Sequence, residues 1–245
     1  MKKKVSITLE KDVLSRIEEI AKKQGINRSK YIEKVMLSQT RKIPVLILAG
    51  RAQINSQHKS LIEYKGKKII DRQLNYIKNQ GLSDIYISTD SVKLKSYLEK
   101  AHPEVSVMLE TEKIGSAGTL KKAKDLFGRR FIFMYCDILI ELDLNELIKF
   151  HLRNKSSTTL VLKSRKNVSK FGVAVLEGSR IIGFEEKPDK SESHLIYIGI
   201  GIIEADAAEK LKNGKFELQL NDLENKHGYI YEGFWQDFEE EKDFK

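Results

Sequence analysis

The chain has 245 residues, of which 40% are hydrophobic and 32% are charged, enough for one large or two unequal domains. This composition is too apolar for a disordered chain and too charged for a membrane protein. The single cysteine excludes an intramolecular disulfide and a thiolate zinc site. Because the opening residues lack the apolar block of a secretory signal, we expect a cytoplasmic protein.

The positive charge is concentrated in the first sixth of the sequence. The formal net charge is +9, and residues 1–42 contain 12 basic and 5 acidic residues, whereas the remaining 203 residues contain 32 and 30. A basic segment attached to a nearly neutral body predicts a polyanionic partner for that segment alone. A solvated charged face is the alternative, and charge does not separate the two.

The basic segment contains a predicted strand and two predicted helices. Apolar residues occupy every second position over residues 4–9, which predicts a strand with one buried face. Apolar residues at helical spacing follow over residues 14–21, and Gly25 is suited to end that helix. A second helix is predicted to begin at Asn27 or Ser29. A segment this small buries little core, and its lone strand has unpaired edges, so we expect the strand to pair with its copy in a homodimer.

The order of strand, helix, glycine, Asn-Arg-Ser and helix over residues 2–39 resembles the ribbon-helix-helix family of DNA-binding proteins. The resemblance implies a two-stranded ribbon that enters the major groove of double-stranded DNA. The side chains implied to read base edges are Lys4, Ser6 and Thr8. The residues implied to hold a phosphate at the helix start are Asn27, Arg28 and Ser29. The alternative is that this segment only dimerises the protein.

The remainder of the chain alternates between predicted strands and predicted helices. Pro44 favours a domain boundary near residue 42, which gives domains at 1–42 and 43–245. Buried strands are predicted at 45–48, 85–88 and 131–135. Amphipathic or short helices are predicted at 69–79, 94–100, 120–126 and 144–151. This alternation predicts an α/β domain with a mostly parallel central sheet.

Five motifs in this second region follow one another in a characteristic order. They are Leu48-Ala49-Gly50, the stretch ETEKIGSAGTL at 110–120, Cys136-Asp137-Ile138-Leu139, the pair FGV at 171–173 and GFEEKP at 183–188, and Trp235-Gln236-Asp237. Together they resemble the sugar-1-phosphate nucleotidyltransferases, which join a nucleoside triphosphate to a sugar phosphate. The resemblance spans residues 45–244 and implies a Rossmann-like nucleotidyltransferase domain.

The resemblance also implies roles for individual residues. Asp137 and Asp237 match the family's two Mg²⁺-holding aspartates, and Lys59 stands for its lysine, which makes these three the predicted catalytic residues. Lys187 is implied to pair with the sugar phosphate, and Glu186 to accept bonds from sugar hydroxyls. The other residues implied to bind nucleotide, sugar phosphate or nucleotide sugar are Leu48, Ala49, Gly50, Arg51, Gly115, Gly172 and Gly199. Taken singly, each carboxylate or lysine is equally well explained as a turn or surface residue.

The sequence departs from the family pattern mainly in the phosphate loop. Arg51 replaces the second glycine of the signature, no later glycine follows in the loop, and the loop is shorter. Three smaller departures are Cys136 in place of a glycine, Tyr197-Ile198-Gly199 in place of Asn-Ala-Gly, and Glu239-Glu240-Glu241 in place of Gly-Thr-Pro. The sugar-side motifs are therefore kept better than the loop that grips a triphosphate.

Three functions are compatible with these observations. The preferred hypothesis is a DNA-binding regulator whose second domain senses a sugar phosphate or nucleotide sugar. The alternative is an active Mg²⁺-dependent sugar-1-phosphate nucleotidyltransferase with an N-terminal module for dimerisation or DNA tethering. The third is a structural dimer with a vestigial cleft. The base, the sugar and the operator sequence are not determined by the sequence.

Overall fold

The computed structural model describes residues 6–23, 25–32, 43–50 and 52–239. The chain divides into two compact units, Met1–Lys42 and Ile43–Lys245. Among the described residues, no helix has both the length and the apolar character that crossing a bilayer requires.

The first unit contains the two predicted helical segments. Helix α1 spans Lys11–Lys23, Gly25 follows it with a left-handed φ of 64°, and residues 28–32 are again helical. Residues 6–10 form neither helix nor strand, and the side chain of Ile7 is exposed. The alternating pattern is therefore not a strand within the single chain, and a ribbon between two chains stays a prediction.

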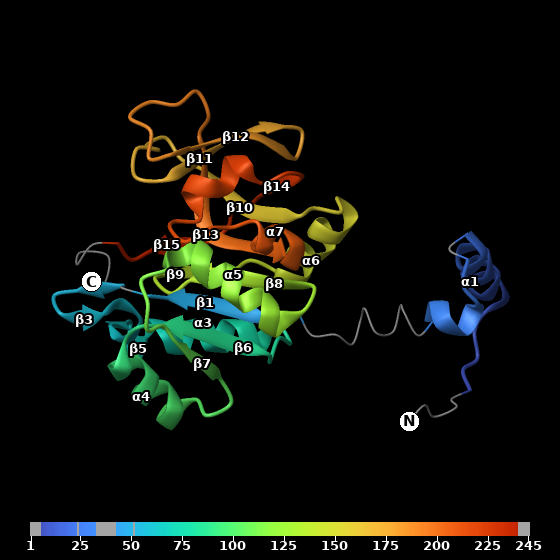
Figure 1. The fold of residues 1–245 in the computed structure, drawn as a ribbon, viewed down its shortest axis with the longest axis horizontal. Helices are drawn as coiled ribbons and strands as arrows, with labels where there is room; N and C mark the ends of the chain where they lie inside the picture. Colours follow the sequence, from blue (N-terminus) through green and yellow to red (C-terminus); the bar gives the residue numbers. More distant parts are fainter. Residues whose placement is uncertain (1–5, 24, 33–42, 51, 240–245) are drawn as a thin grey trace. The chain divides into compact units, whose positions relative to one another are not determined.

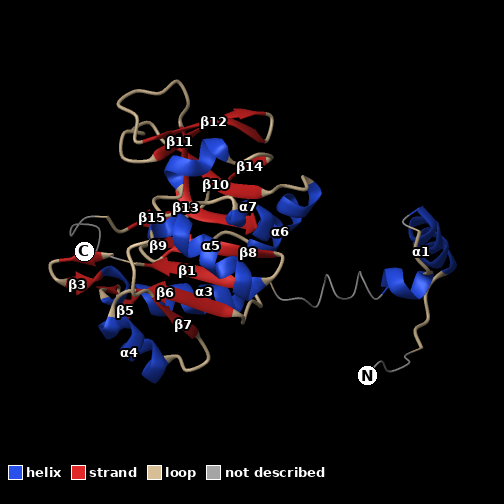
Figure 2. Ribbon diagram, viewed as in Figure 1, coloured by secondary structure: helices blue, strands red, loops and turns tan. Residues whose placement is uncertain are grey.

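The second unit is built on a nine-stranded sheet with the order β10-β14-β12-β11-β13-β8-β1-β6-β7 (Figures 1 and 2). Its strands are β1 Val45–Ala49, β6 Ile85–Thr89, β7 Ser106–Leu109, β8 Arg130–Tyr135, β10 Thr158–Ser164, β11 Gly172–Glu177, β12 Arg180–Glu186, β13 Leu195–Glu204 and β14 Lys226–Ile230. Three short antiparallel pairs accompany it: β2 Gln53–Ile54 with β3 Gln57–His58, β4 Glu63–Tyr64 with β5 Lys67–Lys68, and β9 Ile138–Ile140 with β15 Trp235–Asp237. The helices are α3 Ile69–Asn79, α4 Val92–Ala101, α5 Gly115–Phe127, α6 Leu144–Arg153 and α7 Ala205–Glu209, with short 3-10 turns η1 Lys59–Leu61 and η2 Glu217–Asp222.

The predicted α/β architecture is confirmed, but the prediction of a mostly parallel sheet is wrong. Strands β7, β6, β1 and β8 are parallel, as the strand–helix alternation predicted. Beyond β8 the long strand β13 runs antiparallel and is followed by the hairpin β11–β12. Of the described pairings in this sheet, four are parallel and five antiparallel. Hairpins need only short connections, and they replace the helical crossovers that keep strands parallel.

Helices cover both faces of the sheet, because alternate residues of each strand point to opposite faces. In β1, Val45 and Ile47 pack into a core with the apolar side chains of α3, α4 and α6. Leu46 and Leu48 pack into the other core, which contains α5, α7 and η2. A strand buried on both faces explains why β1 is an uninterrupted apolar run.

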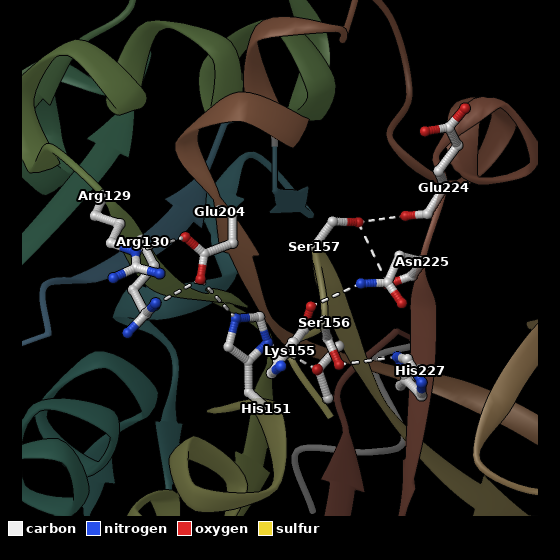
Figure 3. Close-up of polar contacts among 11 residues, drawn as sticks. Arg129, Arg130, His151, Lys155, Ser156, Ser157, Glu204, Glu224, Asn225 and His227 are labelled. Carbon is white, nitrogen blue, oxygen red and sulfur yellow. Dashed lines mark hydrogen bonds and ion pairs between the residues drawn. The ribbon is translucent and has the colours of Figure 1, made fainter. Parts of the chain in front are cut away.

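A buried polar network joins α6 to the sheet (Figure 3). The buried His151 has Nδ1 2.8 Å from Thr159 Oγ1 and Nε2 3.2 Å from Glu204 Oε1. Glu204 also accepts a hydrogen bond from Arg130 Nε at 2.6 Å. Burial raises the pKa of Glu204, but the hydrogen bonds from His151 and Arg130 outweigh it, so the pKa is lowered. The ionised carboxylate therefore ties the end of β13 to α6 and β8.

Candidate functional site

A cavity of about 600 Å³ opens where β1 and β8 end at their carboxyl ends. In an α/β sheet this edge is the usual place for a ligand. Nine of the predicted catalytic and binding residues line it, from seven separate segments: Leu48, Gly50, Lys59, Asp137, Gly172, Glu186, Lys187, Gly199 and Asp237. The tertiary structure thus brings together residues that are almost 190 positions apart in the sequence.

An ion pair between Lys59 and Asp137 lies at the centre of this lining. Lys59 Nζ donates to Asp137 Oδ2 at 2.9 Å, and the two side chains are only 12% and 23% exposed. Burial lowers the pKa of Lys59, but the charges of Asp137 and Asp237 and the hydrogen bond that Lys59 donates to Asp137 outweigh it, so the pKa is raised. Lys59 therefore stays cationic inside the cavity.

The second aspartate is brought beside the first by strand pairing. Asp137 directly precedes β9, and β15 pairs antiparallel with β9 so that Asp237 lies opposite Ile138. The Phe238 N–H donates to the Asp137 carbonyl at 2.9 Å, which continues this pairing. Both carboxylates consequently belong to the same rim of the cavity.

Gln73 holds the turn that carries Asp137. This residue of α3 is buried, and its Nε2 donates to the carbonyls of Tyr135 at 2.8 Å and Ile138 at 2.7 Å. The Cys136 N–H donates to the Leu48 carbonyl at 3.1 Å. The backbone around Asp137 is therefore fixed from both sides by groups that are themselves buried.

The segment after Gly50 forms a tight hairpin. Strands β2 and β3 are joined by Asn55 and Ser56, whose φ values of 47° and 62° are left-handed. Two such residues make a two-residue hairpin turn, which differs from an open glycine-rich cradle of backbone N–H groups. At its end, His58 Nε2 donates to the Ala49 carbonyl at 2.9 Å, while Nδ1 accepts from the Ser60 N–H at 3.3 Å. Burial lowers the pKa of His58, so this neutral tautomer anchors the hairpin to β1.

Glu186 and Lys187 line the opposite wall. Burial and the neighbouring charge of Glu217 raise the pKa of Glu186, and its Oε2 is buried without a hydrogen-bond partner among the described residues. Lys187 has a left-handed φ of 49°, and its Nζ lies 3.8 Å from Glu239 Oε1. Glu239, one of the three glutamates that stand in place of the family's Gly-Thr-Pro, thus pairs with Lys187 of the cavity.

The surroundings of two further predicted binding residues, Gly115 and Ala49, are set by other parts of the chain. Gly115 has a left-handed φ of 71°, and a Cβ there would lie 2.4 Å from the Gly214 carbonyl oxygen, so another segment approaches it closely. Ala49 is completely buried in β1 and contributes its carbonyl to His58. Arg51, like Lys4 in the first unit, lies outside the described residues.

The structure adds residues that the sequence analysis did not place at the site. The cavity is also lined by Tyr135, Tyr197, Lys215, Glu217 and Trp235. Tyr135 lies in β8, Tyr197 in β13 and Trp235 in β15, while Glu217 begins η2 and Lys215 lies just before it. No single local motif contains these residues. Tyr197 and Trp235 occur in motifs of the sequence, but β13 is a nearly continuous buried run and β15 has only three residues, and neither pattern indicates a ligand.

The carboxylates suit magnesium better than a metal that needs an all-protein cage. Within the described chain, no three His, Cys, Asp or Glu side chains are grouped closely enough to hold a metal ion. Asp137 and Asp237 offer hard carboxylate oxygens at one rim of the cavity. Mg²⁺ is commonly held by one or two carboxylates together with substrate phosphates and water. The donor set therefore fits Mg²⁺, with Asp137 and Asp237 as its holders.

The predicted DNA-contacting residues that the structure describes belong to the first unit. Asn27 Oδ1 accepts from the Lys30 N–H at 2.8 Å, which caps the helical segment, and Arg28 Nη1 pairs with Glu18 of α1 at 2.9 Å. Ser6, Thr8 and Ser29 are exposed. These contacts explain how the two helical segments are held together, and base or phosphate contacts stay predictions.

A mixed α/β sheet with two aspartates and a partly buried lysine around one cavity is typical of the nucleotidyltransferase class of fold. Residues 55–238 match the family described as Nucleotidyl transferase, and the chain belongs to this family. That match does not extend over the first 42 residues.

Curated relatives and solved structures agree with this assignment. The chain is 29% identical over 203 residues to a mannose-1-phosphate guanyltransferase of Yarrowia lipolytica and 24% identical over 205 residues to a probable mannose-1-phosphate guanylyltransferase of Arabidopsis thaliana. These alignments cover 76% of this chain but only 56% and 62% of the relatives. The crystal structure of HddC from Yersinia pseudotuberculosis superimposes with a TM-score of 0.73 at 21% identity, covering 82% of this chain and 96% of that one. A structure of HddC complexed with GMP-PN gives a TM-score of 0.71.

Proposed function

We propose that the second unit is a Mg²⁺-dependent sugar-1-phosphate nucleotidyltransferase. In this reaction a phosphate oxygen of the sugar 1-phosphate attacks the α-phosphorus of a nucleoside triphosphate. A new P–O bond forms, the bond between the α-phosphorus and the oxygen bridging to the β-phosphate breaks, and pyrophosphate leaves with the electron pair. The products are a nucleoside diphosphate sugar and pyrophosphate, so no other reactant is needed.

One observation carries this proposal: two aspartates, the partly buried Lys59, and the neighbouring Glu186 and Lys187 line one cavity. The reaction brings several negative charges together, so positioning and cationic stabilisation supply most of the catalysis. Lys59 is held cationic by its neighbours and is suited to a phosphate oxygen of the triphosphate. Lys187, on the opposite wall, is suited to the phosphate of the sugar.

Magnesium fits the same arrangement. A bound Mg²⁺ neutralises charge on the phosphates and orients them for displacement. Asp137 and Asp237 are the residues that would hold it, and Gln73 keeps the turn of Asp137 in place.

The relatives suggest which substrates to test first. Mannose-1-phosphate guanylyltransferases among the relatives, and the HddC complex with GMP-PN, favour a guanine nucleotide and mannose 1-phosphate. A neighbour of similar fold described as a putative glucose-1-phosphate thymidylyltransferase, from Bacillus anthracis, adds glucose 1-phosphate and a thymidine nucleotide to the panel.

Pyrophosphate release tests the proposal directly. The full-length chain is incubated with each pair of triphosphate and sugar 1-phosphate, with Mg²⁺ or with a chelator. We expect release with at least one pair, its loss with the chelator, and a fall of about 10²-fold or more in Asp137→Asn and Asp237→Asn. Asp125→Asn, at a 72% exposed side chain on α5 outside the cavity lining, is the matched control and retains activity. Absence of release across the whole panel would refute the proposal.

A ligand-sensing DNA-binding regulator is the second candidate. The specific observation in its favour is the tight hairpin at Asn55 and Ser56. This hairpin stands in place of the open, glycine-rich loop with which the family pattern grips a triphosphate. The basic first unit is suited to a polyanion. A gel-shift titration against the chain's own upstream DNA, with and without nucleotide sugars, tests it. Binding no tighter than to random DNA at moderate salt would reject this function.

A further inference from the structure

Two tyrosines on neighbouring strands line the cavity with their ring centroids 6.4 Å apart. Their hydroxyl groups differ in hydrogen bonding. Tyr135, at the end of β8, donates its hydroxyl to Glu217 Oε1 at 2.6 Å. Tyr197, near the start of β13, is only 5% exposed, and its hydroxyl is buried with no hydrogen-bond partner among the described residues. One tyrosine is thus satisfied within the chain and the other is not.

The unpaired hydroxyl of Tyr197 is costly to the folded protein. Burying a hydroxyl without a partner costs about 1–3 kcal/mol, and most buried polar side-chain atoms in proteins are paired. The Tyr197 ring packs in an apolar core and stacks edge-on with Phe184 at 6.4 Å. A phenylalanine would provide the same ring contacts, so packing does not explain the hydroxyl.

A second unpaired polar atom belongs to Glu186, which also lines this cavity. Glu186 Oε2, at the end of β12, is buried without a partner among the described residues. A tyrosine hydroxyl donates readily, and a carboxylate oxygen only accepts. A sugar hydroxyl does both: its oxygen accepts one hydrogen bond and its O–H donates another. The pair of unpaired atoms is therefore complementary to hydroxyl groups on a sugar ring.

We propose that Tyr197 determines substrate specificity by donating a hydrogen bond to one hydroxyl group of the sugar 1-phosphate, while Glu186 accepts from the same or an adjacent hydroxyl. This inference rests on the proposed function, because it assigns a role within the same cavity. It predicts a substrate class: sugar 1-phosphates that bear a free hydroxyl at that ring position, with the corresponding deoxy sugars excluded. A site built around a substrate hydroxyl discriminates strongly against an analogue that lacks it, since its own polar groups are then left unpaired.

The experiment compares Tyr197→Phe with Tyr135→Phe in the full-length chain. Thermal unfolding of the ligand-free proteins is measured first. Tyr135→Phe removes the donor to Glu217 and lowers the Tm by several degrees. Tyr197→Phe removes a hydroxyl that has no partner, so its Tm equals or exceeds that of the parent protein. A loss of Tm in Tyr197→Phe as large as that in Tyr135→Phe would overturn the inference, because the hydroxyl would then be paired in the unbound protein.

Binding is then measured by calorimetry with mannose 1-phosphate, glucose 1-phosphate and each singly deoxygenated analogue of both. The titrations are done at about pH 8, because burial and the charge of Glu217 raise the pKa of Glu186 and an alkaline buffer favours its carboxylate form. We expect Tyr197→Phe to weaken binding of the preferred sugar phosphate about tenfold. For one deoxy analogue the parent and the variant should bind equally, because the hydroxyl that Tyr197 contacts is missing from that ligand.

The outcomes separate this inference from the proposed function. If the parent binds a sugar phosphate and Tyr197→Phe binds it equally well, Tyr197 does not contact the sugar, and the proposed function is unaffected. A tenfold loss that is the same for every analogue would place the effect on the cavity as a whole and would also refute the inference. Failure of the parent protein to bind any sugar phosphate in the panel would overturn both proposals.

Discussion

Replacing Gln73 by methionine tests whether the turn that carries Asp137 is held in place by helix α3. The side chain is 1% exposed, and its amide nitrogen satisfies two carbonyls, of Tyr135 and Ile138, at 2.8 and 2.7 Å. Methionine fills a similar volume but donates nothing. Each buried carbonyl left unpaired costs about 1–3 kcal/mol. Gln73 Oε1 has no partner within the described chain, so its removal relieves about 1 kcal/mol. The two carbonyls together cost about 2–6 kcal/mol, so the expected net loss of stability is about 1–5 kcal/mol.

Urea denaturation at neutral pH measures this loss, with Gln57→Met as the matched control. Gln57 also donates its Nε2 to a carbonyl, that of Leu61 at 3.3 Å, but the bond is exposed, so the expected change is within about 0.5 kcal/mol. Because the turn carries Asp137, pyrophosphate release by Gln73→Met should also fall by about 10²-fold at temperatures where the variant is folded. A stability loss below about 1 kcal/mol, equal to the control, would refute the reasoning.

Three further predictions concern titratable groups. Glu204→Gln lowers the free energy of unfolding at neutral pH; because the pKa of Glu204 is lowered in the folded state, the wild-type advantage exists above about pH 4.5 and is lost as pH falls through the lowered pKa. Urea denaturation at neutral pH and at a pH well below 4.5 checks this, with Glu224→Gln, at an 86% exposed side chain, as the control. A difference in unfolding free energy between wild type and Glu204→Gln that stays constant at all pH values would contradict it. Lys59→Met reduces pyrophosphate release by about 10²-fold while Lys59→Arg retains part of it, and activity of the methionine variant close to that of the parent would remove Lys59 from the reaction. Burial and the nearby Asp137 raise the pKa of the Cys136 thiol, so a thiol reagent modifies it only after unfolding, and rapid labelling of the native protein would show the packing to be wrong.

The sequence alone determined the local elements of the second unit. Its strong periodicity predicted α3 at residues 69–79, where the structure has it, and the apolar run at 45–48 predicted β1. Both patterns are local, since a helix face or a doubly buried strand is recorded in neighbouring residues. The motif order likewise identified Lys59, Asp137 and Asp237 as residues of one site before any contact was known.

Only the tertiary structure decided which of these residues meet and which remain unpaired. The antiparallel half of the sheet was missed because strand direction depends on connections and partners rather than on residue pattern. The fold brings Gly115 against Gly214, about 100 positions away, and no local pattern indicates that approach. Tyr135 and Tyr197 have the same side chain, but only the fold places Glu217 beside one hydroxyl and leaves the other without a partner in the described chain. Contacts between distant segments set the chemistry of the cavity, and such contacts leave no local periodicity in a sequence.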